Sequence, residues 1–150
     1  PGADRRSDSN YSDVQWWLEI YTALGATGVN ATVNVTYNDD TSGNLTAIAL
    51  GATPRAGRLY PLVSASAGKF IKAVNSVTLS ATTGTAGNFG ITATRPRTSV
   101  SAPLLNKTET FDWAQLGLPV IPNDSCLMMV MLCGTTSTGA VRGQGKLAHG

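Results

Sequence analysis

Hydrophobic and polar residues alternate along much of the chain, which is the pattern of β-strands with one buried face. The clearest run is Val29–Tyr37, in which every second residue is apolar. The run Val14–Tyr21 fits either a helix capped by Ser12 or a strand. The strand is favoured because aromatic and β-branched residues prefer that setting. It would place one set of side chains on one face (Trp16, Leu18, Ile20) and the next set on the other (Trp17, Glu19, Tyr21).

The stretch Ser76–Thr94 has the same alternation on both sides of a glycine-rich centre. Apolar positions recur at every second residue before and after that centre (Val77, Leu79, Ala81, Phe89, Ile91, Ala93). Two alternating runs joined by a Gly-rich loop predict an antiparallel β-hairpin. Its polar face would carry only the hydroxyl groups of Ser and Thr and the hydrogen atoms of Gly. It could therefore form a contact surface, but it could not supply a catalytic group.

Shorter segments extend the β pattern. A turn-rich loop, a partner strand and a second loop are expected in succession (Asn38–Asn44, Leu45–Leu50, Gly51–Gly57). Arg58–Ser64 contains Pro61, which indicates an edge strand or a bulge. Cys126–Leu132 is continuously apolar and predicts a strand buried on both faces.

One helical turn is expected in the later part of the chain. Thr110 or Asp112 would cap it, and Gly117 would end it. The other elements are short strands separated by turns, without alternating helices. They predict an all-β chain, folded as a single-domain antiparallel β-sandwich or jelly-roll-like structure with extended terminal arms. The expected divisions are an N-terminal arm (1–13), a sandwich domain (14–133) and a C-terminal strand or arm (134–150).

Composition adds an unusually neutral surface to this picture. Hydrophobic residues make up 42% of the 150 residues and charged residues only 13%, against a usual charged content of about 25%. Weak charge repulsion favours assembly with neighbouring molecules. A net charge of +2, without a concentrated basic patch, argues against a dedicated nucleic-acid binder. The longest apolar run is far shorter than the roughly 18 residues of a membrane span.

The cysteines do not predict a disulfide. Cys126 and Cys133 would face opposite sides of one strand, about 23 Å apart at about 3.3 Å per residue. That separation excludes a bond between them within the strand. We expect two buried thiols, which suits a reducing compartment.

Residues suited to catalysis are scarce. His149 is the single histidine and lies next to the chain end, which argues against Ser–His and Cys–His catalysis and leaves too few ligands for zinc. Asp39 and Asp40 could contribute to a calcium site, but a hydrogen-bonded hairpin loop is favoured because the EF-hand spacing is absent. We expect a non-enzymatic protein with no catalytic residue, cofactor or metal.

Six residues are candidates for an interface. Trp16 and Trp17 are adjacent, so on a strand one would point inward and the other could anchor a partner. Four arginines flank loops and prolines (Arg55, Arg58, Arg95, Arg97). If they converge, they would suit an acidic partner surface; otherwise they are solvated. Six Asn-X-Ser/Thr motifs are interpreted as chance matches in a chain rich in Ser and Thr, although a secreted glycoprotein domain remains an alternative.

The Thr/Ala/Gly-rich strands, the Ser76–Thr92 stretch and the Asp112–Pro119 segment resemble those of tailed-bacteriophage virion proteins. In size and style the chain is most similar to small capsid cement or decoration proteins. The resemblance implies a β-sandwich on the capsid surface, assembled in the host cytoplasm and bound to the major capsid protein, other virion proteins and further copies of itself. It implies neither a membrane nor a specific nucleic acid as partner, and it transfers no site residue.

Two alternatives stay open at this point. The chain could be a tail, baseplate or fibre β-domain of the same particle. It could instead be a carbohydrate-binding β-sandwich module that uses Trp16 or Trp17 together with Tyr21.

Overall fold

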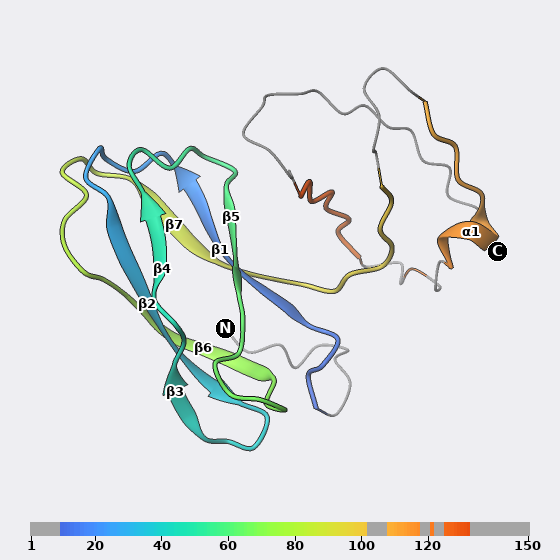
Figure 1. Ribbon diagram of the computed structural model, residues 1–150, viewed down its shortest axis with the longest axis horizontal. Coiled ribbons are helices and arrows are strands. Elements are labelled where there is room, and N and C mark those ends of the chain that lie inside the picture. Colours follow the sequence, from blue (N-terminus) through green and yellow to red (C-terminus); the bar gives the residue numbers. More distant parts are fainter. Residues whose placement is uncertain (1–9, 102–107, 118–120, 122–124, 133–150) are drawn as a thin grey trace. The chain divides into compact units, whose positions relative to one another are not determined.

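Two antiparallel β-sheets form the sandwich (Figure 1). The computed structural model describes residues 10–101, 108–117, 121 and 125–132. One sheet has the order β5-β1-β7, with β1 at Gln15–Thr22, β5 at Leu59–Leu62 and β7 at Asn88–Thr94. In the other, β2 (Val29–Tyr37) pairs with β3 (Ser42–Asn44) and β4 (Ile48–Gly51), and also with β6 (Ile71–Leu79). The all-β sandwich predicted from the sequence is confirmed.

The core forms where the alternating apolar side chains of the two sheets meet. Every second residue of β1 and β2 is buried, as the period of two requires. This confirms the strand at 14–21 over the helix. One polar contact also joins the sheets: the indole Nε1 of Trp16 donates to the carbonyl of Ile71 at 2.9 Å. The buried apolar residues are Trp16, Leu18, Ile20, Leu24, Val29, Ala31, Val33, Val35, Tyr37, Leu45, Leu50, Tyr60, Leu62, Ile71 and Val74.

The predicted hairpin at Ser76–Thr94 is wrong in its pairing. Both alternating runs are strands, but β6 pairs with β2 and β7 pairs with β1 in the opposite sheet. The glycine-rich connection between them therefore crosses from one sheet to the other. Alternation shows that each strand has one buried face, and two strands on opposite sides of a core satisfy that pattern as well as two neighbours do.

Three connections between the sheets meet at one end of the sandwich (Figure 1): β1 to β2, β4 to β5, and β6 to β7. Backbone hydrogen bonds tie them together. The amide of Thr27 donates to the carbonyl of Thr83 at 3.2 Å, and the amide of Thr53 donates to the carbonyl of Gly25 at 3.1 Å. Leu24 donates in the same way to Pro54 at 3.2 Å. The first connection thus lies between the other two.

Glycine is required where these connections touch. A Cβ at Gly25 would lie 1.9 Å from the carbonyl oxygen of Thr83, and a Cβ at Gly87 would lie 2.6 Å from the carbonyl oxygen of Ala23. Both contacts are with backbone atoms, which cannot turn away as the end of a side chain can. The connection from β1 to β2 and the connection from β6 to β7 can approach this closely only because neither glycine has a side chain.

Pro61 lies on an edge strand, as predicted. β5 pairs with β1 alone, and the amide of Ile20 donates to the carbonyl of Arg58 at 3.0 Å. Because hydrogen-bonded pairs alternate along an antiparallel ladder, the nitrogen of Pro61, opposite Trp17, faces the free side. The missing N–H therefore costs no hydrogen bond within the sheet.

The predicted loop at Asn38–Asn44 also needs a correction, because its last three residues form β3. The turn itself is shorter and lies between β2 and β3. Ser42, Gly43 and Asn44 carry no apolar side chain, so periodicity could not reveal a strand that is held by backbone pairing to residues 34–36 of β2. The partner strand expected at 45–50 is present as β4, shifted to Ile48–Gly51.

The helical turn is confirmed as α1, Trp113–Leu116. The carboxylate of Asp112 accepts from the amide of Gln115 at 2.8 Å, and the side chain of Gln115 accepts from the amide of Asp112 at 3.0 Å. This reciprocal pair is a capping box. Gly117 ends the turn in the left-handed conformation, with φ of 54°.

The core strand expected at Cys126–Leu132 is wrong. Within the described residues this segment is not in a strand, and Met129 and Leu132 are 75% and 83% exposed. An apolar composition favours burial, but a strand also needs a neighbouring backbone, and none of the described segments pairs with it. Cys126 is exposed, contrary to the expected buried thiol, and Cys133 lies outside the described residues.

The chain divides into two units, Pro1–Leu118 and Pro119–Gly150, and the strands found among the described residues all lie in the first. The predicted arms at 1–13 and 134–150 lie outside the described residues, except for 10–13. The boundaries of the sandwich domain therefore stay predictions.

We expect Gly25→Ala to destabilise the sandwich. Its new Cβ would meet the Thr83 carbonyl, and overpacking of this kind costs about 1–3 kcal/mol or more of unfolding free energy. Urea denaturation monitored by tryptophan fluorescence measures the change.

Gly28→Ala is the matched control for this substitution. A Cβ at Gly28 has its nearest neighbour at 3.5 Å, so the free energy of unfolding should change by less than about 1 kcal/mol. If the two substitutions lower the free energy of unfolding equally, the close contact between Gly25 and Thr83 does not constrain the fold.

Candidate interaction site

The outer face of the β2 sheet carries a network of amides and hydroxyls, which we call the amide face (Asn34, Thr36, Ser42, Asn44, Asn75). The side-chain amide of Asn34 donates to Asn44 at 2.7 Å and accepts from Asn75 at 2.9 Å. Asn75 also donates to the hydroxyl of Thr36 at 3.0 Å, and that hydroxyl lies 3.2 Å from the one of Ser42. The network spans β3, β2 and β6, and its side chains bond to one another.

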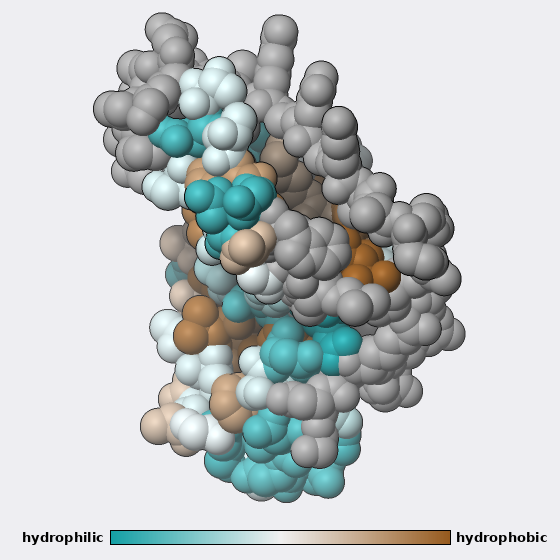
Figure 2. Space-filling view, turned by 90° about the vertical axis from the view of Figure 1, so that its right-hand side faces the viewer, coloured by the Kyte–Doolittle hydropathy of each residue, from teal (hydrophilic) through white to brown (hydrophobic). Residues whose placement is uncertain are grey.

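Charge is nearly absent from this sheet. β2, β3 and β4 contain no charged residue, and the single lysine of β6, Lys72, pairs with Asp40 in the turn after β2. Burying a charged group costs more free energy than burying a neutral polar group that keeps its hydrogen bonds. A partner can therefore cover this neutral, internally bonded surface without the desolvation of a charged group. Figure 2 shows the hydropathy of one face of the molecule: among its coloured residues, brown apolar residues lie between teal and pale polar ones.

The outer face of the β1 sheet differs, and we call it the aromatic face (Trp17, Glu19, Tyr21, Thr92). Tyr21 is 49% exposed, and a Cβ at Gly90 would meet its ring at 2.5 Å, so the ring lies across β7. The hydroxyl of Thr92 donates to the carboxylate of Glu19. Along β1, the carboxylate of Glu19 therefore lies between the aromatic residues Trp17 and Tyr21.

The structure separates the two adjacent tryptophans as the alternation predicted. Trp16 points into the core and is 1% exposed, so it has no surface left for a partner. Trp17 lies on the aromatic face, half-buried, and its Nε1 donates to the hydroxyl of Thr94 at 2.7 Å. Of the pair, only Trp17 can touch another molecule in this fold.

The four arginines do not converge. Arg55 and Arg58 lie in the connection before β5, where Arg58 accepts from Ile20 near the end of β1. Arg95 and Arg97 follow β7, whose last residue lies opposite Gln15 at the start of β1. The two pairs are thus at opposite ends of β1, roughly 17 Å apart at about 3.3 Å per residue.

Two of these arginines also have partners within the chain. The guanidinium of Arg58 lies 4.9 Å from the ring centroid of Tyr60, and Arg95 pairs with Asp13. Burial raises the pKa of Tyr60 above its usual value, against a smaller opposing effect of Arg58. A single basic surface for an acidic partner is therefore not formed by these four residues.

The Asp39–Asp40 turn is a hydrogen-bonded hairpin loop, as favoured from the sequence. Asp39 accepts from the hydroxyl and the amide of Thr41 at 2.6 and 3.2 Å, and it pairs with Lys69 at 2.7 Å. Hydrogen bonds from Lys69 and then from Thr41 lower the pKa of Asp39 from 3.8 to about 2. No group of three or more potential metal ligands occurs among the residues that the structure describes.

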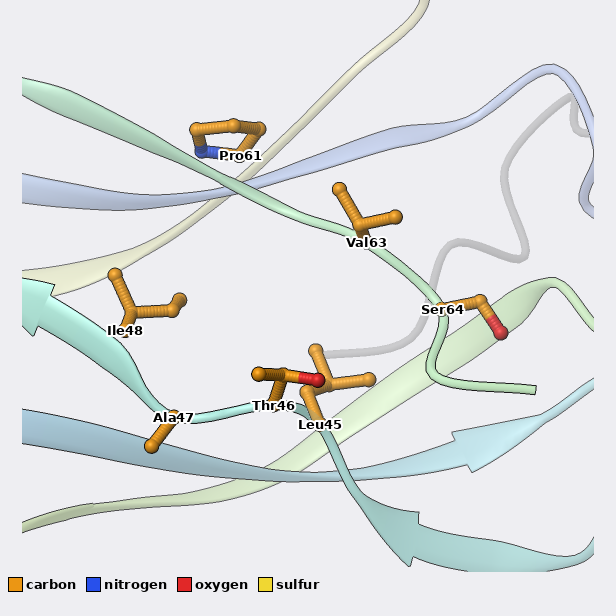
Figure 3. A pocket seen from close by; sticks show the side chains of 7 residues that line it. All are labelled: Leu45, Thr46, Ala47, Ile48, Pro61, Val63 and Ser64. Atoms are coloured by element: carbon orange, nitrogen blue, oxygen red, sulfur yellow. The ribbon is translucent and has the colours of Figure 1, made fainter.

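The hollows of the sandwich are small. One of about 250 Å³ lies between the β3–β4 connection and β5 (Figure 3) and is lined by Leu45, Thr46, Ala47, Ile48, Pro61, Val63 and Ser64. Its lining is apolar except for Thr46 and Ser64 and holds no acid or base. A second, of about 220 Å³, is lined by Ser12, Asp13, Val14, Gln15 and Pro96. In the second hollow the carboxylate of Asp13 pairs with the guanidinium of Arg95.

None of the helices in the described ranges has the length and hydrophobicity to cross a bilayer. His149 lies outside these ranges.

Comparison with protein-family models, with curated proteins and with solved structures finds no match to this chain.

Sequence reasoning missed the amide face. Asn34 and Asn44 lie on either side of a hairpin turn and opposite each other in the β2–β3 pair. Their contact could have been predicted from their distances in sequence to that turn. Asn75 had none, because it joins the network at a bulge: Asn34 lies opposite Ser76, while the next residue, Val35, lies opposite Val74. A bulge depends on the partner strand and is not visible in the alternation of one strand.

Trp16→Phe and Trp17→Phe should differ in stability. The first leaves the buried carbonyl of Ile71 without the indole donor, at a cost of about 1–3 kcal/mol in unfolding free energy. The second removes a bond at a half-exposed site and should cost less than about 1 kcal/mol. Urea denaturation monitored by circular dichroism compares the two; a larger loss for Trp17→Phe would contradict the assigned orientations.

The carboxyl group of Asp39 should titrate at about pH 2. Because its pKa in the folded state is below the unfolded value, its stabilising contribution is complete above about pH 4 and is lost as the pH falls toward 2. Lys69→Met should move the midpoint toward 3.8, as measured by NMR of the side-chain carboxyl carbon. Lys72→Met, which removes the partner of Asp40 instead, should leave the midpoint of Asp39 unchanged.

Proposed function

We propose that this protein is a structural subunit of a tailed-bacteriophage virion, and specifically a capsid cement or decoration protein. The observation that carries the proposal is the nearly uncharged outer face of the β2 sheet, with its internally bonded amide face. The resemblance of the strand segments to virion proteins gives the class of particle.

The physical argument is one of desolvation. A cement subunit must cover broad contacts with its neighbours many times over one shell. Burying charged side chains would cost several kcal/mol per ion unless each is paired. Neutral amides and hydroxyls that already bond to one another avoid this penalty, and the apolar side chains at the edges contribute about 25 cal/mol for each Å² buried.

A carbohydrate-binding module is the second candidate, and the aromatic face favours it. Trp17 and Tyr21 share one face with the carboxylate of Glu19, a combination of apolar rings and a polar acceptor that suits small polar ligands. It ranks second because neither of the two hollows described above is lined by Trp17, Glu19 or Tyr21.

The copy number of this chain in purified particles tests the proposal. Quantitative mass spectrometry should find it in an amount comparable to the major capsid protein, and particles without it should break at lower temperature. A copy number typical of one ring or one fibre would assign it to the tail or baseplate. Absence from the particle would overturn the proposal.

A pair of charge substitutions tests the face itself. Thr78→Glu places a carboxylate on the outer face of β6, opposite Thr32, and should reduce the amount bound to particles at least severalfold. Ala56→Glu, at an exposed position in the connection before β5, should leave binding unchanged. Sugar binding on a glycan array that is lost with Trp17→Ala would instead support the carbohydrate-binding module.

A further inference from the structure

The free edges of the two sheets differ in how they are protected against pairing with another strand. On β5, Pro61 removes an N–H from the free side. β3 and β4 are short, with three and four residues. β6 contains two irregularities in register and the charged Lys72. Each of these features is one by which proteins discourage edge-to-edge pairing.

β7 lacks them except at its first residue: Asn88 lies opposite Thr22, past a shift in register that follows Ile20 of β1. Its seven residues, Asn88–Thr94, include neither a charge nor a proline. Its register with β1 is unbroken from Gln15 opposite Thr94 to Ile20 opposite Phe89. Within the described part of the chain β7 pairs with β1 alone, so the N–H and C=O groups along its other side form a regular, unprotected edge.

The core behind this edge is incompletely covered. The inward side chains of β7, Phe89 and Ile91, are only partly buried, and Ala93 is exposed. On β6, Val77 and Leu79 are likewise only partly buried. An additional strand beside β7 would cover apolar side chains as well as pair the edge.

The sequence of β7 is complementary to itself. If two copies pair antiparallel about Ile91, all seven residues of each strand take part. Phe89, the largest side chain, then lies opposite Ala93, while Ile91 lies opposite Ile91 and Gly90 opposite Thr92. Directly opposed residues share a face of a sheet, so the apolar set meets the apolar set. Arg95, just past the strand, would lie opposite Gly87 and not opposite another arginine.

We propose that β7 pairs with β7 of a second copy, antiparallel and about a two-fold axis at Ile91, and joins the two three-stranded sheets into one continuous sheet. Such a contact is isologous, because the same strand is used by both copies. The inference goes beyond the proposed function and does not depend on it, since it concerns the chain alone in solution.

Cross-linking of cysteine variants of the full chain tests the register. With both native cysteines replaced by serine, Asn88→Cys and Thr94→Cys are made separately. Position 88 of one copy lies opposite position 94 of the other, so an oxidised mixture should form disulfide-linked dimers. Neither variant alone should do so, because two copies of one position would be about 20 Å apart at about 3.4 Å per residue.

A charge at the edge tests the same contact without cysteines. Ala93→Lys places an ammonium group against Phe89 of the second copy, and Ala93 is exposed within one chain, so the fold should tolerate it. Sedimentation equilibrium should show a dimer for the unsubstituted chain and a dissociation constant raised at least about tenfold for Ala93→Lys. Ala49→Lys, at an exposed alanine of β4, is the matched control and should leave the dimer unchanged.

Two results would overturn the proposal. One is a monomeric unsubstituted chain at its highest soluble concentration. The other is a dimer that survives Ala93→Lys but is lost with Met129→Asp, which would assign the contact to the exposed apolar segment at 125–132.

Discussion

The sandwich depends on the close approach of two backbone segments at one end. Gly25, in the connection from β1 to β2, lies against the carbonyl of Thr83, in the connection from β6 to β7, and a Cβ on Gly25 would be 1.9 Å from that oxygen. The two connections lie side by side here, and each joins the two sheets. The strands that they link are neighbours as well: β1 pairs with β7 in one sheet, and β2 pairs with β6 in the other.

The arrangement of strands in turn gives the molecule surfaces of different chemistry. The β2 sheet exposes neutral amides and hydroxyls that bond to one another, and the β1 sheet exposes Trp17, Glu19 and Tyr21. Among the described residues β7 has a partner on one side only, where a hairpin partner would have covered the other side. The low-charge face supports the proposed function, and the β7 edge supports the pairing of two copies.

Much of the fold could be predicted from the sequence because its signals are local. Alternation identified β1 and β2 and the inward orientation of Trp16, and Pro61 indicated an edge. Asp112 and Gly117 marked the ends of α1. The candidate site was predicted less well. Trp17 was identified as a possible contact, but the arginines were grouped by residue type alone, and the structure places them at opposite ends of β1.

By itself the sequence determined which residues of β1 and β2 face inward, where α1 begins and ends, and that the chain is poor in charge, since each of these depends on the identity and spacing of nearby residues. The tertiary structure alone decided which strands are neighbours. Phe89 and Ile91 alternate in the same way whether β7 pairs with β6 or with β1, so periodicity could not choose between the two. Strand neighbours are set by contacts between residues far apart in the chain, such as that between Gly25 and Thr83, which a local pattern does not contain. The tertiary structure also places Asn75 in the amide face and, among the described residues, gives β7 a partner on one side only.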